Sequence, residues 1–223
     1  MSDDTPTQKL DDIHQSIQKQ HKLGNQRIKA WYSDEYSRPE ELDTIDRPPH
    51  QTLFSRSAEL ADFAADSLAN KEVRLGGPAP AVEMITYGVA VEILLSGIHL
   101  KVQPEKFIER LENQNETPSY NECEQILIAD LRSDIPSEQL GILVKTLEIV
   151  RDQRNNEAHL GYHTFQHSHL DGLILELIYV LLELYSDKDI PESDSIKRSI
   201  EEVRGQLPTY SRVVTFDLDE LFD

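Results

Sequence analysis

The sequence predicts an almost entirely α-helical protein. Its long apolar patterns recur every three to four residues, the period of a helix with one buried face. An alternation of apolar and polar residues, as in a strand, appears only near the end of the chain. A chain of 223 residues with 38% hydrophobic content is long enough for one well-buried core, but short for two. We therefore expect one main domain, an antiparallel helical bundle, with appendages at both ends.

Residues 1–51 are expected to form a helical arm and a linker. Between residues 9 and 28, Leu10, Ile13 and Ile17 form a helical stripe, but their neighbours are mostly polar, so the buried face is thin. The stretch from 33 to 51 contains three prolines and many charges, which indicates a linker.

Residues 52–208 carry the other helical patterns and are expected to form the bundle. Gly76 and Gly77 interrupt them, and because no Gly-Lys-Ser/Thr follows, they indicate a turn and not a phosphate-binding loop. The helix at 170–185 is apolar nearly all round, so it should lie centrally. The predicted helices are 53–70, 81–100, 104–111, one around 123–131, one around 140–150, 170–185 and one that begins at 193 or 194.

The first helix of this bundle has small and apolar residues along one side. This face is expected to be buried, and its members are Phe54, Ala58, Ala61, Ala65 and Leu68.

The final segment, residues 209–223, has a different composition. From Thr215 onward, acidic residues alternate with apolar ones. This pattern is typical of acidic partner-binding tails, and it fits a docked terminal segment equally well.

The charge balance restricts the function. There are 41 acidic and 22 basic residues, a net charge of -19, which repels a polyanion at long range. This argues against a general nucleic-acid-coating protein, so any RNA contact must be local. Such an acidic excess also keeps a protein hydrated in a salty cytoplasm, and it fits a halophilic source.

The sequence also indicates a cellular compartment. A single cysteine, Cys123, can form neither an internal disulfide nor a cysteine zinc site, which favours a reducing environment. The start of the chain, 1–6, lacks the basic and apolar regions of a secretory signal. The apolar stretch 173–185 is interrupted by Glu176 and Glu183 and is shorter than the roughly 20 residues that span a bilayer. We expect a cytoplasmic protein without a membrane anchor.

Arg154, Asn155 and His159 are the candidate catalytic residues. The apolar stripe of the helix around 140–150 reaches Arg154 after one further step of four residues from Val150. A buried cation without a partner is costly, so Arg154 needs an anion or a carboxylate, in a cleft between helices or between subunits. We expect this helix to end near Arg154, with His159 close to its end.

The combination of Arg154, polar Asn155, three more residues and His159, ahead of a long apolar helix, resembles the HEPN (higher eukaryotes and prokaryotes nucleotide-binding) family. The family signature is an arginine, four to six residues and a histidine, often with a polar residue after the arginine. The similarity in helix order extends over about 53–207, although the motif itself is short.

The resemblance implies a metal-independent endoribonuclease that uses no cofactor. The ribose 2′-hydroxyl attacks the adjacent phosphodiester and leaves a cyclic phosphate. His159 would transfer the proton, Arg154 would stabilise the charge on the phosphate oxygens, and Asn155 would orient the phosphate or the histidine. The family also implies a homodimer whose two motifs line one cleft. Arg151 and Lys145 would extend its RNA-binding surface, and ordinary solvated charges are an equally good reading of both.

The resemblance further implies a toxin or antiviral defence role, with an antitoxin or another regulatory protein as partner. Some HEPN toxins are silenced by modification of a tyrosine two residues after the motif histidine. Here that position is Gly161, and Tyr162 follows one residue later. This departure puts that form of regulation in doubt.

Two alternatives stay open. His159, His163, His167 and His169 are close in sequence and could bind zinc or nickel, although Gly161 and the polar residues between them favour a loop. The second alternative is a non-enzymatic dimeric scaffold that recruits a partner through its arm or its acidic tail.

Overall fold

The computed structural model describes residues 6–33, 47–69, 81–114, 116–160, 168–187, 190, 193–206 and 216. Within these ranges every regular element is a helix, which confirms the all-α prediction. The helices are α1 (Pro6–Tyr32), α2 (Pro49–Ala69), α3 (Ala81–Val102), α4 (Pro104–Gln114), α5 (Tyr120–Leu131), α6 (Ser137–Leu160), α7 (Ser168–Tyr185) and α8 (Ser193–Gln206).

Two of the boundaries that differ from the expectation bear on the sites described below. Helix α2 begins at Pro49, inside the predicted linker, because a proline fits the first helical turn, where its missing N–H is not needed. Helix α6 continues to Leu160 and does not end near Arg154. No proline or glycine interrupts the chain between Arg154 and Gly161, so nothing breaks the helix earlier. Arg154 therefore lies inside α6.

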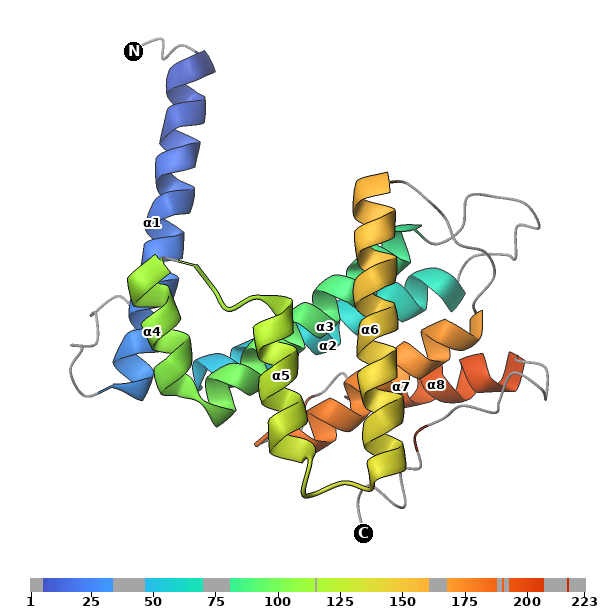
Figure 1. Cartoon of the computed structure of the whole chain (residues 1–223). Coiled ribbons are helices and arrows are strands. Elements are labelled where there is room, and N and C mark those ends of the chain that lie inside the picture. Colours follow the sequence, from blue (N-terminus) through green and yellow to red (C-terminus); the bar gives the residue numbers. More distant parts are fainter. Residues whose placement is uncertain are drawn as a thin grey trace.

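Helices α2 and α3 lie side by side and run in opposite directions through the centre of the protein (Figure 1). Near the start of α2, the Phe54 ring lies against Gly97, where an added Cβ would be 2.7 Å from the ring. Further along α2, Ser57 Oγ donates to the Ala90 carbonyl at 2.8 Å. The predicted buried face of α2 is confirmed at Phe54, Ala58, Ala61 and Ala65, while the Leu68 side chain lies outside the described residues.

From residue 172 to 185, helix α7 is buried nearly all round, as its apolar sequence predicted. Helix α8 packs against α2 and α7, and α5 and α6 cross α3 (Figure 1). Full burial of one large apolar side chain contributes about 1.5–3 kcal/mol relative to exposure. The fully buried residues of α7 are Ile174, Leu175, Leu177, Ile178, Val180, Leu181 and Leu182.

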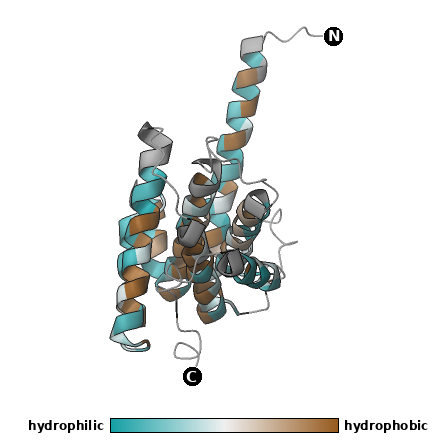
Figure 2. Ribbon diagram, turned by 90° about the vertical axis from the view of Figure 1, so that its right-hand side faces the viewer, coloured by the Kyte–Doolittle hydropathy of each residue, from teal (hydrophilic) through white to brown (hydrophobic). Residues whose placement is uncertain are grey.

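Helix α1 extends away from the rest of the protein (Figures 1 and 2). Its base packs near Leu100 and Phe107 through Ile28 and Tyr32. Towards its free end, the side chains of the predicted stripe are mostly in solvent: Leu10 is 65%, Ile13 56% and Ile17 61% exposed.

Among the described residues, one stretch, Ile85–Val102 of α3, is long and apolar enough to cross a membrane, and more than half of it is buried within the protein.

In the C-terminal segment, Phe216 is buried, and its N–H donates to Glu176 Oε2 at 3.2 Å.

Candidate active site

Arg154 lies where α6 crosses α3. A Cβ added to Gly88 of α3 would be 2.7 Å from the Arg154 Cβ and 2.8 Å from its Cγ. The two backbones thus approach as closely as a glycine allows. One turn further along α3, Glu92 Oε2 lies 2.7 Å from Arg154 Nη2. The partner that the sequence required for Arg154 is therefore a carboxylate of α3.

This ion pair is accessible to solvent. The side chains of Arg154 and Glu92 are 29% and 36% exposed. Solvent screens a pair of this kind, which typically contributes no more than about 1 kcal/mol. A phosphate that arrived at the surface would compete with Glu92 for the guanidinium at a modest energetic cost.

The other two motif residues lie further along α6. Asn155 is exposed, and the His159 side chain lies outside the described residues. Because each helical residue turns the chain by about 100°, position 159 lies one turn beyond Asn155, and about 140° around the helix axis from Arg154. The α6 backbone therefore does not place positions 154 and 159 on one face.

Arg151 and Lys145 each have a carboxylate neighbour. Arg151 Nη1 lies 3.0 Å from both Glu124 Oε2 and Asn121 Oδ1, and burial raises the pKa of Glu124. Lys145 Nζ lies 2.7 Å from Glu148 Oε2, and this hydrogen bond lowers the pKa of Glu148. Both proposed RNA-binding cations are thus locally balanced by negative charge.

The histidine cluster lies largely beyond the described structure. His163 and His167 are outside the described residues, as are the side chains of His159 and His169. Within the described part of the chain, no three His, Cys, Asp or Glu side chains are arranged to hold a metal ion. The metal-binding alternative rests on the sequence alone.

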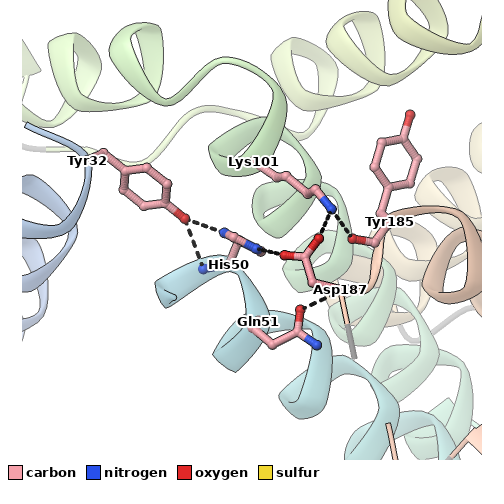
Figure 3. A network of polar contacts seen from close by, with 6 residues as sticks. All are labelled: Tyr32, His50, Gln51, Lys101, Tyr185 and Asp187. Carbon is pink, nitrogen blue, oxygen red and sulfur yellow. Dashed lines mark hydrogen bonds and ion pairs between the residues drawn. The ribbon is translucent and has the colours of Figure 1, made fainter. Parts of the chain in front are cut away.

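A polar network that the sequence gave no reason to expect lies at the base of α1 (Figure 3). The Tyr32 hydroxyl is hydrogen-bonded to His50 Nδ1, and His50 Nε2 lies 2.9 Å from Asp187 Oδ2. Lys101 Nζ donates to Asp187 Oδ1 at 2.5 Å and to the Tyr185 carbonyl at 2.8 Å. The network joins α1, α2, α3 and the end of α7.

The order of the groups, from the Tyr32 hydroxyl through the His50 imidazole to the Asp187 carboxylate, is that of a catalytic triad. Burial, however, raises the pKa of Tyr32 to about 12, so its hydroxyl keeps its proton at neutral pH. The His50 ring is buried and packs edge-on against Phe54, with 5.6 Å between the ring centroids. The network is thus better suited to fastening α1 to the other helices than to attacking a substrate.

Comparisons of this chain with models of known protein families, with curated proteins and with solved structures found no match.

Proposed function

We propose that this protein is a metal-independent endoribonuclease of the HEPN type. The observation that carries the proposal is the position of Arg154, a partly exposed guanidinium held at 2.7 Å from Glu92 where two helices cross. Asn155 follows it on the exposed surface of the same helix, and the backbone places His159 one turn beyond Asn155. A phosphate-binding cation and a group that titrates near neutral pH thus share one helix.

The reaction needs two proton transfers. The 2′-oxygen forms a bond to phosphorus as its proton leaves to a base, and the bond from phosphorus to the 5′-oxygen breaks as that oxygen receives a proton. The products are a 2′,3′-cyclic phosphate and a free 5′-hydroxyl. Arg154, released from Glu92, would stabilise the charge on the non-bridging oxygens, and Asn155 would orient the phosphate.

A homodimer accounts for the separation of the two residues around α6. Because positions 154 and 159 lie about 140° apart around the axis, one helix does not direct both toward one phosphate. In a two-fold arrangement, Arg154 of one subunit would act with His159 of the other. That histidine would take the proton of the 2′-hydroxyl and deliver it to the departing 5′-oxygen, so one histidine serves both proton transfers.

The decisive experiment is cleavage of a single-stranded RNA by the purified protein with a chelator present. Arg154→Ala and His159→Ala should each slow cleavage by at least about 100-fold, the usual effect of losing a group that stabilises transition-state charge or one that transfers a proton. Arg132→Ala, which removes an exposed cation just after α5, is the matched control and should cut at the full rate. DNA of the same sequence should stay intact because it lacks the 2′-hydroxyl. A fully active His159→Ala variant, or cleavage that stops on chelation and returns with zinc, would favour the histidine-cluster metal site.

The dimer has its own test. Light scattering should report twice 25.5 kDa. Mixing the inactive Arg154→Ala and His159→Ala proteins should restore part of the activity, because a mixed dimer keeps one cleft with both residues intact. A mixture that stays inactive after subunit exchange would contradict the shared cleft.

The second candidate function is a helical scaffold, favoured by one observation, the exposed stripe of α1. Leu10, Ile13 and Ile17 lie on a helix that leaves the other helices, where they bury little within the chain. The partner would be a regulatory protein such as an antitoxin, and both functions fit a cytoplasmic protein. Replacing the three residues with serine distinguishes the two roles, because an enzyme should keep its cleavage rate whereas a scaffold should lose its partner.

A further inference from the structure

A pocket of about 360 Å³ lies between α4 and α5, at the C-terminal end of α3 and away from Arg154. It exists because α4 and α5 both pack against α3 but hardly against each other. Lys106, Glu109, Arg110 and Asn113 share one face of α4 and line one side, and His99 of α3 also lines the pocket. Its volume is within the range of roughly 300–1,000 Å³ that is usual for small-molecule sites.

His99 has hydrogen-bonding capacity that the fold does not use. Its side chain is buried, with the residue only 4% exposed, and its Nδ1 lies 3.6 Å from Cys123 Sγ. Nε2 has no hydrogen-bond partner among the residues that the structure describes. Folded proteins rarely leave a buried polar group without a partner, because the hydration that the group loses is then not replaced.

The surroundings of His99 indicate which nitrogen carries its proton. Burial lowers the pKa of His99, so the ring is neutral at pH 7. Burial also raises the pKa of Cys123 to about 12, so the thiol keeps its proton and can donate it to Nδ1. When the thiol donates to Nδ1, the ring hydrogen lies on Nε2, which is then a donor.

Two cations of α4 add further donors. Arg110 Nε is buried and has no partner in the described structure, while Arg110 Nη2 lies 3.6 Å from Glu122 Oε2. Glu122 is itself occupied, since it accepts hydrogen bonds from both the backbone N–H and the hydroxyl of Ser119, each at 2.7 Å. Lys106 is exposed and forms no ion pair within the described ranges. His99, Lys106 and Arg110 all line the pocket, and each has a donor that the described part of the fold leaves unused.

We propose that this pocket binds a small molecule through an oxyanion group, a carboxylate or a phosphate, that accepts hydrogen bonds from His99 Nε2, Arg110 Nε and Lys106 Nζ. Because His99 is buried, the oxyanion would sit at the deep end of the pocket. The rest of the molecule would lie toward the exposed side chains of Glu109 and Asn113. The exposed carboxylate of Glu109 favours ligands with a positively charged or hydroxyl group at that end. The site is independent of Arg154 and of RNA cleavage.

The experiment follows the ring nitrogens of His99 by nuclear magnetic resonance in the full-length protein. Acetate and inorganic phosphate are titrated separately, so that the two arms distinguish a carboxylate ligand from a phosphate ligand. We expect the hydrogen to lie on Nε2, and a saturable shift of that nitrogen with at least one of the two probes. Hydrogen on Nδ1, or no saturable shift with either probe at millimolar concentration, would overturn the proposal.

Variants separate specific binding from general ionic effects. Arg110→Gln and Lys106→Gln should each weaken binding by about tenfold or more, as expected when a charged hydrogen bond is lost. Arg132→Gln removes the same charge outside the pocket and should leave binding unchanged. Equal weakening by all three variants would contradict the assigned site. Lys106 is exposed, so its variant remains informative even if replacing Arg110 disturbs folding.

Discussion

Replacing Gly88 with alanine adds one methyl group at the closest approach of α3 and α6. The new Cβ would lie 2.7 Å from the Cβ of Arg154. Both atoms are attached directly to their backbones, so no change of side-chain rotamer can separate them. The two helices must move apart, and this movement would also separate Arg154 from Glu92.

Two opposing effects set the change in the free energy of unfolding caused by Gly88→Ala. Overpacking a close contact costs about 1–3 kcal/mol. Alanine in place of glycine inside a helix contributes about 0.5–1 kcal/mol in the other direction. The free energy of unfolding should therefore fall by up to about 2.5 kcal/mol. For a chain of this length, each kcal/mol corresponds to about 2–4 °C in Tm.

Urea denaturation followed by far-ultraviolet circular dichroism measures this change. Gly141→Ala in α6 is the matched control, because a Cβ there meets nothing within 4 Å and the variant should be more stable than the wild type. Adding Arg154→Ala to Gly88→Ala should not restore stability, since alanine keeps the Cβ that clashes. A Gly88→Ala protein as stable as Gly141→Ala would refute the close crossing.

Three further predictions concern other parts of the protein. Lys101 and His50 hold the pKa of Asp187 below its ordinary value of 3.8, so its charge stabilises the fold above that pH. Asp187→Asn should therefore destabilise the protein fully at about pH 7, and the loss of stability should shrink as the pH falls through the folded-state pKa of Asp187. The same loss of stability at the lowest pH at which the protein stays folded would contradict this. Tyr120→Phe removes a hydroxyl that donates to the Leu147 carbonyl at 3.0 Å, and should lower the free energy of unfolding by about 1 kcal/mol in urea denaturation, whereas unchanged stability would count against the bond. Ile13→Ser at an exposed position should change stability by less than about 0.5 kcal/mol, and a larger, concentration-dependent loss would show that the stripe is buried between copies.

Much of the helical structure could be predicted because a helix with a buried face leaves a local pattern. The apolar segment at 170–185 became the buried helix α7, and the stripe of small residues on α2 is buried from Phe54 to Ala65. The predicted start of α2 and the predicted end of α6 were wrong. The prolines and charges of residues 33–51 indicated a linker, although α2 already begins at Pro49. The apolar stripe of α6 stops near Arg154, and the polar residues after it do not show where the helix ends.

For the candidate active site, too, some features follow from the sequence and others only from the tertiary structure. The sequence by itself determined that Arg154 continues an apolar stripe and so needs a partner, because a cation beside a buried face is costly without one. Only the tertiary structure decided that the partner is Glu92 and that Gly88 brings the helices together, since the crossing point of two helices depends on how their surfaces interlock. The same holds for Tyr32 and His50, whose contacts join segments that no local pattern connects.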